Sequence, residues 1–509
     1  MTEKVKTYYG FMSQITADEL YKGLVRYGMF SEKLPPIFSG KLFLDYCLKF
    51  NNQPFVNKQK QTQRGYVNYE TVRNINIPRD IGIPTPMGHE LLCKTLTEHW
   101  AELLNFFKEK TEGQPRIISR THIRKMNGTQ ALFYMNYKNW RVDGTPEPDI
   151  YLGKRYMVHA DISKCYPSIY THAIPWALVG KDAAKIDKNM KTYWYNEIDY
   201  YARLSKNGET HGILIGPHTS NILSEIILCA IDENLSKKYD SYIRNIDDYT
   251  CYVNTKDDAE RFIIDLSREL RKYDLLLNHK KTEIKELPIC VGETWIHKIQ
   301  NQLATFQKFK DYVDYKEVQA FMDFTIKLVS ENKDNNAIVL YAVKALKDFN
   351  LSINAQKYLI KSVVSLSLLY PYLVPILGKY IFDKYKVESN QVQKYAKMIY
   401  ETYIEKNNYE ACSFALLYAI NSKTKINDIN IDTITSSQDC ILMLMAFIYC
   451  KKNKLEKKIE QLDNYAQELA KTNEIDQYWL FLYECTQYLE GEWAAMKKNG
   501  VSFLKPEYR

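Results

Sequence analysis

The sequence predicts an α+β fold in its first 300 residues and an all-α fold in the remainder. Strand-like runs of β-branched and aromatic residues, interrupted by Gly and Pro, occur between about residues 66 and 300. Beyond residue 301 such runs become sparse, and amphipathic segments with apolar residues three and four positions apart follow one another. We therefore expect a helical segment over residues 1–65, a mixed domain over 66–300 and an α-helical repeat domain over 301–509.

Composition restricts the class of protein. Of the 509 residues, 45% are hydrophobic and 26% are charged, as in ordinary globular proteins. Lys and Arg outnumber Asp and Glu by 69 to 61, and this net charge of +8 permits a nucleic-acid or nucleotide partner without requiring one. The cysteines form no C-x-x-C pair, and the apolar run from Val363 to Leu377 is interrupted by two prolines and is too short to cross a membrane. We expect a soluble, cytoplasmic protein without a zinc site or membrane association.

Two stretches place carboxylates where strand-like runs end. Residues 156–162 form one such run and contain Asp161, and Ser241–Val253 predicts a hairpin whose turn holds Asp247 and Asp248. A charge at the end of an apolar strand and two adjacent carboxylates in a tight turn both favour a neutralising cation. Each stretch alone also has a simpler interpretation. Asp161 could be only a helix N-cap or a turn residue, and Asp247 and Asp248 could form an ordinary acidic turn.

Three further stretches carry weaker signals. Residues 76–88 are rich in Pro and Gly, which predicts an extended loop. Residues 114–125 alternate basic and apolar side chains, so Arg116 and Arg120 belong either to a phosphate-binding finger or to a solvent-exposed edge strand that charge protects. A glycine-bracketed turn at residues 212–216 leads into a predicted helix, where backbone can approach a ligand closely.

Taken in chain order, these stretches suggest a nucleotidyl-transfer site. This chemistry uses two divalent cations about 4 Å apart, one to lower the pKa of the attacking oxygen and one to neutralise the triphosphate. Asp161 and Asp247, on neighbouring strands, would hold the pair, with Asp248 as a further ligand or support. Carboxylate oxygens suit Mg²⁺, with Mn²⁺ as its substitute.

The ordered set resembles the reverse-transcriptase superfamily over about residues 70–290. The segments that carry the resemblance are Asp161–Tyr166 for motif A, Gly212–Gly216 with Ser220 for motif B, Asn245–Asp248 for the Y-x-D-D box and Leu277–Thr282 for motif D. The resemblance implies a fingers and palm domain. It also implies that Tyr166 excludes a ribose 2′-hydroxyl and that Lys281 protonates or steadies the leaving pyrophosphate. The other nucleotide contacts that it implies are Arg116, Arg120, Gly216 and Ser220.

A closer resemblance is to the bacterial abortive-infection (Abi) polymerases. Residues 166–176, Tyr-Pro-Ser-Ile-Tyr-Thr-His-Ala-Ile-Pro-Trp, are similar to a signature of this group, as are Gly180–Lys181 and Glu209–Gly212. A reverse-transcriptase-like half followed by a HEAT-like helical-repeat half is similar as well. The resemblance implies phage defence in the bacterial cytoplasm by protein-primed, template-independent DNA synthesis from dNTPs. It further implies homo-oligomers and a single-stranded DNA product attached to a tyrosine.

Some residues depart from the reverse-transcriptase pattern. Asn245 replaces the aromatic residue that opens the Y-x-D-D box, and Leu214 and Ile215 replace the usual Pro-Gln of motif B. These side chains normally help to seat primer and template, so their replacement argues against templated copying and leaves the metal chemistry intact. Two alternatives stay open, a templated reverse transcriptase with a dedicated RNA partner and a catalytically silent interaction scaffold.

A priming tyrosine must reach the metal site, which favours a flexible terminus. Tyr8 and Tyr9, beside Gly10, are the candidates among the 41 tyrosines. Packing in the core or on the surface is the other interpretation of either residue.

Overall fold

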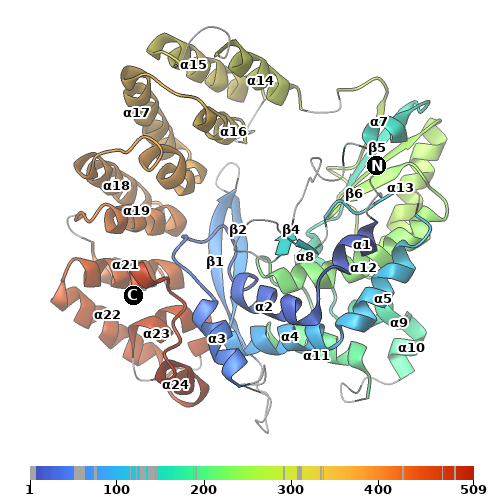
Figure 1. Ribbon diagram of the computed structural model, residues 1–509, viewed down its shortest axis with the longest axis horizontal. Helices are drawn as coiled ribbons and strands as arrows, with labels where there is room; N and C mark the ends of the chain where they lie inside the picture. Colours follow the sequence, from blue (N-terminus) through green and yellow to red (C-terminus); the bar gives the residue numbers. More distant parts are fainter. Residues whose placement is uncertain are drawn as a thin grey trace.

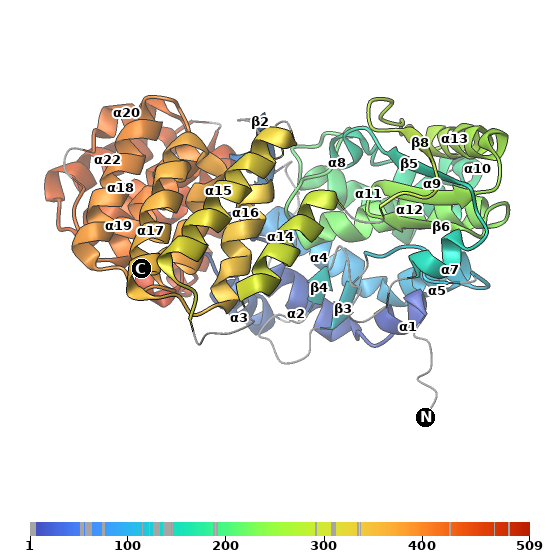
Figure 2. The ribbon, with the colours of Figure 1, turned by 90° about the horizontal axis from the view of Figure 1, so that it is seen from above.

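Two parts of the molecule lie beside each other, and a long β-hairpin stands between them (Figure 1). The computed structural model describes residues 7–50, 55, 64–73, 77–114, 116–121, 123–125, 133–135, 144, 146–186, 189, 192–290, 293–306, 312–332, 335, 337–426, 429–472, 474–486 and 489–509. The N-terminal half forms a mixed part of helices and strands. The residues beyond 293 form a helical part, and the view from above shows the same division (Figure 2).

Three helices precede the hairpin, and the first two pack on helices that follow it. They are α1 (Tyr8–Met12), α2 (Ala17–Tyr27) and α3 (Lys41–Lys49). Helix α2 begins at a capping box, in which Thr16 and Glu19 satisfy each other's backbone N–H groups. It packs on α4 (Pro86–Glu98), and α1 packs on α5 (Trp100–Thr111), so the N-terminal segment belongs to the same hydrophobic core as the mixed domain.

The hairpin corrects the expectation of an extended loop over residues 76–88. Strands β1 (Tyr66–Arg73) and β2 (Ile77–Pro84) pair antiparallel along their whole length. The prolines of β2 are compatible with pairing because the strand has only one strand neighbour, and an edge strand tolerates a missing backbone donor. Pro86 then stands in the first turn of α4, after the N-cap Thr85. A second, short hairpin follows, made of β3 (Ile123–Lys125) and β4 (Phe133–Met135).

The palm is a four-stranded antiparallel sheet in the order β6-β7-β5-β8. Its strands are β5 (Tyr156–Asp161), β6 (Tyr242–Asn245), β7 (Asp248–Val253) and β8 (Glu283–Glu286). The predicted hairpin over residues 241–253 is therefore present as β6–β7. Helix α13 packs on β5 and β7, and α12 packs on α13. The helices of this part are α7 (Glu147–Tyr151), α8 (Cys165–Ser168), α9 (Ala173–Val179), α10 (Lys181–Ile186), α11 (Trp194–Leu204), α12 (His218–Ser236) and α13 (Lys256–Arg271).

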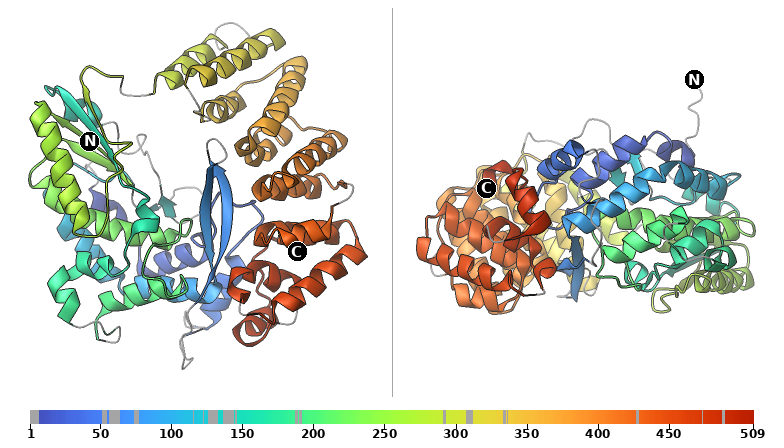
Figure 3. Two further views of the ribbon diagram at one scale, coloured as in Figure 1. Left: turned by 180° about the vertical axis from the view of Figure 1, so that it is seen from behind. Right: turned by 90° about the horizontal axis from the view of Figure 1, so that it is seen from below.

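The part beyond residue 293 is helical in its described residues, as the periodicity predicts. Its α-helices are α14 (Thr294–Phe306), α15 (Tyr315–Glu331), α16 (Ala337–Ala345), α17 (Ile353–Leu369), α18 (Ser389–Ile404), α19 (Tyr409–Asn421), α20 (Ile431–Ser436), α21 (Cys440–Lys452), α22 (Glu456–Leu469), α23 (Trp479–Cys485) and α24 (Gly491–Lys498). Shorter 3₁₀ or π segments are η1 (Leu346–Asp348), η2 (Pro371–Ile376), η3 (Gly378–Phe382), η4 (Ile475–Gln477) and η5 (Pro506–Tyr508). The helices follow one another in a curved array (Figure 3). A HEAT-like repeat and the boundaries at residues 65 and 300 stay predictions.

The helical part holds the backbone of the β1–β2 hairpin. The Glu410 carboxylate on α19 accepts a hydrogen bond from Val72 N at 2.7 Å, and the Asp476 carboxylate accepts one from Gly65 N at 2.7 Å. These acids satisfy N–H groups on the open side of β1, which would otherwise be an unpaired sheet edge. Among the described residues, no helix is both long enough and apolar enough to span a bilayer.

Candidate active site

Three carboxylates meet at one end of the palm sheet. Asp161 is the last residue of β5 and pairs directly with Asp248, the first residue of β7. Asp247 lies in the β6–β7 turn, and its carbonyl oxygen accepts a hydrogen bond from Ile162 N at 3.1 Å. One oxygen from each of the three carboxylates lies within 4.8 Å of the others. The structure thus brings together the aspartates that the sequence nominates from two separate stretches.

Burial and mutual repulsion give this cluster the properties of a group that could hold a cation. Burial, followed by a hydrogen bond to Asp161, raises the pKa of Asp248 to about 7. Burial also raises the pKa of Asp247, and the negative charge of Asp161 adds to that rise. A divalent cation would relieve this repulsion, and the donors are carboxylate oxygens, which suit Mg²⁺ and Mn²⁺. The residues present therefore fit the expected metal, with Asp161, Asp247 and Asp248 as its ligands.

Lys281 stands beside the carboxylates, where the motif places it. Its Nζ lies 3.1 Å from Asp161 Oδ2, and its side chain is 57% exposed, so it faces solvent on one side and the carboxylates on the other. The preceding loop is fixed to β5, because Asn278 N donates to Asp161 O at 2.7 Å and Asn278 Nδ2 donates to Asp161 Oδ2 at 2.9 Å. Lys281 N in turn donates to Asn278 O at 3.0 Å. Asn278 was not singled out from the sequence.

Tyr166 lies on the short helix α8, which begins four residues after Asp161. Its hydroxyl donates a hydrogen bond to Asn221 Oδ1 on α12 at 2.7 Å, and Ser224 Oγ of the same helix lies 3.4 Å from that hydroxyl. Burial raises the pKa of Tyr166, so the phenol stays protonated. Two contacts with one helix fix the ring in orientation.

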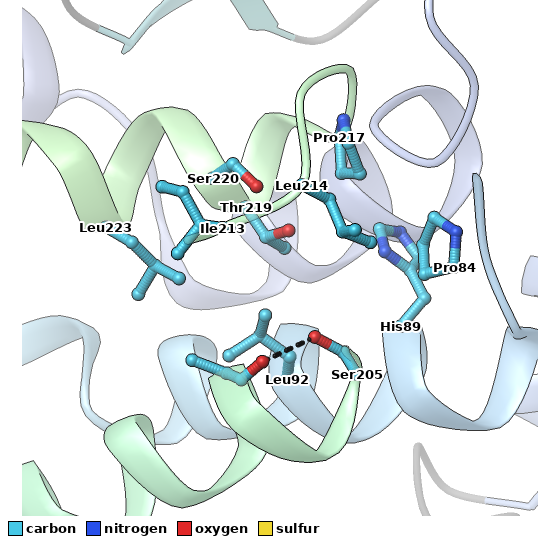
Figure 4. Close-up of a pocket in the computed structure, with 11 residues that line it drawn as sticks. Pro84, His89, Leu92, Ser205, Ile213, Leu214, Pro217, Thr219, Ser220 and Leu223 are labelled. Carbon is cyan, nitrogen blue, oxygen red and sulfur yellow. Dashed lines mark hydrogen bonds between the residues drawn. The ribbon is translucent and has the colours of Figure 1, made fainter. Parts of the chain in front are cut away.

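Gly216 and Ser220 are placed by packing. Gly216 has a φ of +127°, and a Cβ there would lie 3.0 Å from Ile81 Cγ2 of β2, so only glycine lets the loop approach the hairpin this closely. Ser220 is 4% exposed and lines a pocket with His89, Leu92 and Leu223, between α12 and α4 (Figure 4). The structure therefore places Ser220 in the interior of the protein, and its contact with a nucleotide stays a prediction.

Arg116 and Arg120 hold backbone carbonyl groups. Arg116 Nη2 donates to Asp240 O at 2.6 Å, before the start of β6 and at the opposite end of that strand from Asp247. Arg120 is 6% exposed, and its Nη2 donates to Gly144 O at 3.0 Å. Residues 118–120 run alongside β6, with Ser119 bridged to Arg244 in parallel orientation, and the phosphate-binding role of Arg116 and Arg120 stays a prediction.

A different arginine acts on the carboxylates. Burial raises the pKa of Asp247, and the positive charges of Lys281 and of Arg79, an exposed residue of β2, offset part of that rise. The hairpin thus contributes a positive charge that acts on the carboxylates. The sequence held one signal for it, a basic residue inside a Pro/Gly-rich stretch. That signal was missed because the stretch was assigned to a loop.

The N-terminal tyrosines do not lie on a flexible terminus. Tyr8 is 2% exposed, opens α1 and packs against Phe107 at a ring-centroid distance of 5.9 Å. Cys229 Sγ lies 3.5 Å from its hydroxyl, and burial raises the pKa of Tyr8 well above its usual value. Tyr9 is partly buried, and the centroid of its ring lies 6.0 Å from Lys108 Nζ. Both tyrosines lie in a helix because Thr7 caps α1 and the apolar face of this short helix is buried, and their role in priming stays a prediction.

One family of known proteins matches the part of the chain that holds this site. Residues 92–291 match the family described as reverse transcriptase (RNA-dependent DNA polymerase), a range that contains all three carboxylates and Lys281. No curated protein matches the chain. Among solved structures, it is similar to apo telomerase from Candida tropicalis, with 14% identity over 81% of this chain and 73% of that chain and a TM-score of 0.33. It is also similar to telomerase from Candida albicans in complex with the TWJ fragment of telomeric RNA, with 10% identity over 84% and 69% and a TM-score of 0.31. Residues 92–291 are therefore a reverse-transcriptase domain, and the protein is an enzyme, a nucleotidyltransferase of the polymerase class.

Proposed function

We propose that this enzyme is a phage-defence DNA polymerase of the abortive-infection type. It joins dNTPs without a template, starts from a tyrosine of its own chain and works as a homo-oligomer in the bacterial cytoplasm. The observation that carries the proposal is the meeting of three aspartates within 4.8 Å beside Lys281, in a domain of reverse-transcriptase sequence. The Abi-like stretch over residues 166–176 supports the more specific assignment.

The proposed mechanism divides the work between the carboxylates and their neighbours. Asp161, Asp247 and Asp248 would hold the metal pair, which activates the attacking oxygen and neutralises the triphosphate when bound. Lys281, whose Nζ is next to Asp161, would give a proton to the leaving pyrophosphate. Arg79 supplies positive charge from the hairpin for the triphosphate. Tyr166, held by Asn221, would exclude a 2′-hydroxyl and so select dNTPs.

A contact between the hairpin and the motif B loop supports synthesis without a template. Gly82 N of β2 donates to Ile215 O at 2.9 Å. A Cβ on Gly82 would lie 2.7 Å from Leu214 Cδ2, so a larger residue at position 82 would clash with the Leu214 side chain. At Gly82 the hairpin therefore contacts the loop directly, with no base between the two backbones at that point. The replacement of the usual aromatic residue by Asn245 also supports synthesis without a template.

The proposed primer is Tyr8 or Tyr9, and the structure adds a condition to this assignment. Tyr8 is buried, so α1 would have to detach before its hydroxyl could reach the carboxylates. A five-residue helix is among the least stable elements of a fold, and local unfolding of such elements is frequent. Tyr9, which is only partly buried, needs a smaller rearrangement.

The intact mass of the purified protein tests the proposal. It should be measured before and after nuclease treatment, and again after incubation with dNTPs and Mg²⁺. A nuclease-sensitive mass that grows without added template and is absent in Asp247→Ala supports protein-primed synthesis, and peptide mapping then locates the tyrosine. No added mass, with extension only of an added primer on a template, refutes it.

A second candidate function is RNA-templated reverse transcription with a dedicated RNA partner. It is supported by the description of the matching family as RNA-dependent. One defined RNA that co-purifies with the protein would favour this candidate, whereas protein-linked DNA of heterogeneous sequence would favour the first. An enzyme that binds neither Mg²⁺ nor dNTP would instead fit the scaffold alternative.

A further inference from the structure

A fully buried arginine lies directly beneath the carboxylates. Arg244, on β6, is 0% exposed, and its Nη2 lies 2.7 Å from Glu225 Oε1 and 2.7 Å from Asp232 Oδ2, both on α12. Its Nε donates to Asp232 Oδ2 at 2.8 Å. The remaining nitrogen, Nη1, donates to the carbonyl oxygen of Ile246 at 3.0 Å. One guanidinium group therefore joins α12 to the β6–β7 turn.

The carbonyl that Arg244 holds belongs to a strained residue. Ile246 has a φ of 59°, in the left-handed region that a β-branched side chain rarely adopts. It immediately precedes Asp247, so its backbone conformation sets the direction in which that carboxylate leaves the turn. A strained residue persists only where its surroundings hold it in place. The hydrogen bond from Arg244 is a restraint of this kind, applied from the interior of the protein.

The other end of the same network reaches Tyr166. Glu225 follows Ser224 on α12, and Ser224 and Asn221 are the residues that contact the Tyr166 hydroxyl. Ser119 Oγ also donates to Glu225 Oε1 at 3.0 Å, which fixes the carboxylate from a second side. Arg244 is thus the shared contact between the helix that orients Tyr166 and the turn that orients Asp247.

The composition of the network argues against a role in stability alone. Two buried carboxylates face one guanidinium, and burial raises the pKa of both Glu225 and Asp232. Apolar side chains of similar volume often stabilise a fold as well as a buried ion pair does. What they cannot supply is a fixed set of hydrogen bonds in three directions.

We propose that Arg244 is a positioning residue, which sets the metal affinity of the carboxylates and the discrimination against ribonucleotides at Tyr166 by fixing the Asp247 turn relative to α12. The proposal rests on the proposed function at these carboxylates. Residues outside the ligand shell that orient metal ligands commonly change metal affinity or activity by about 10- to 100-fold when they are replaced. Arg244 reaches the ligand Asp247 through the backbone of its neighbour.

The test is the conservative variant Arg244→Lys, which keeps the charge but loses the fork that reaches two carboxylates and a carbonyl. Arg203→Lys is the matched control, because Arg203 on α11 is ion-paired with Asp199 at 3.4 Å and does not contact the turn. Direct Mn²⁺ binding without nucleotide is measured from the electron paramagnetic resonance signal of free Mn²⁺. The ratio of dNTP to rNTP incorporation is measured in parallel.

We expect Arg244→Lys to raise the Mn²⁺ Kd about tenfold and to lower the dNTP preference, while Arg203→Lys changes neither. A folded Arg244→Lys protein with unchanged Kd and discrimination, and only a lower Tm, would overturn the proposal. If that variant does not fold, Glu225→Gln keeps the shape of the network and weakens its charge. It should shift both quantities in the same direction by a smaller factor, and unchanged values would likewise overturn the proposal. Wild-type protein that binds no Mn²⁺, or Asp247→Ala that binds it normally, would instead refute the metal site itself.

Discussion

Asp161 and Asp248 are direct partners in the antiparallel pairing of β5 with β7, so their carboxyl groups leave the sheet side by side. Antiparallel neighbours place Cβ atoms about 5 Å apart, close enough for two carboxylates to share a proton or a cation. The pKa of Asp248, raised to about 7 by burial and by its contact with Asp161, reflects this closeness. Several properties of the enzyme follow from it.

The stability of the metal-free protein should depend on pH through Asp248. Its folded-state pKa is above its unfolded-state value, so the folded state binds more protons between about pH 4 and 7, and the free energy of unfolding falls as pH rises through this range. Because the side chain is 31% exposed and lies near solvent-screened charges, we expect an effect of only about 1–2 kcal/mol. Thermal unfolding of wild type and Asp248→Asn at several pH values measures it. The Tm of the two proteins should be similar at low pH, and wild type should have the lower Tm at pH 8. A difference in Tm that does not change with pH would contradict the prediction.

Metal binding should release protons near neutral pH. A cation at the carboxylates must displace the proton that Asp248 carries below about pH 7. Calorimetric titration of Mg²⁺ at pH 6.5 in buffers of different ionisation enthalpy measures the number of protons released. We expect about half a proton or more per site at pH 6.5 and close to none at pH 8.5. Release that is independent of pH would place the titrating group elsewhere.

Replacing Asp247 should reduce activity and increase stability. Asp247→Asn removes a metal ligand, which should lower nucleotide incorporation more than about 100-fold. It also removes a charge that is destabilised by burial and by Asp161, so the metal-free Tm should rise. Asp257→Asn, in the exposed first turn of α13, is the control and should change neither quantity appreciably. A loss of activity together with a lower Tm would indicate misfolding and contradict the assignment.

Lys281 should act in the chemical step. Lys281→Ala should lower kcat about 100-fold, the usual contribution of a positioned general acid, while the dNTP KM changes less. Lys280→Ala is the matched control, since this neighbouring lysine is also exposed. Single-turnover incorporation rates over a range of pH measure the effect. Equal losses in the two variants would mean that net charge, and not position, is responsible.

Arg79 should bind the triphosphate. Arg79→Ala should raise the dNTP KM about tenfold and make it less sensitive to salt, because it removes an exposed positive charge that acts on Asp247. Arg268→Ala removes a similarly exposed charge, on α13, and should have no such effect. A steady-state comparison of KM at two salt concentrations measures the difference. An unchanged KM in Arg79→Ala would show that the hairpin does not contact the substrate.

The sequence by itself determined the parts of this site that depend on local pattern. A run of alternating residues that ends at Asp161, and a second run that turns at Asp247 and Asp248, specify strands and a hairpin whatever surrounds them. The spacing of apolar residues beyond position 301 likewise specifies helices. Their order along the chain was enough to indicate nucleotidyl transfer, and the family that matches residues 92–291 bears this out.

Tertiary structure alone decided which side chains surround the carboxylates. Arg79 acts on them because the helical part and the motif B loop hold the β1–β2 hairpin, and no pattern within residues 76–88 predicts its pairing. Arg116 turns to Asp240, and Tyr8 is buried against Phe107, because elements far apart in sequence pack on one another. The physical reason is that strand and turn propensities act between near neighbours. Burial and charge contacts are set by packing over the whole chain, where tertiary context overrides local preference.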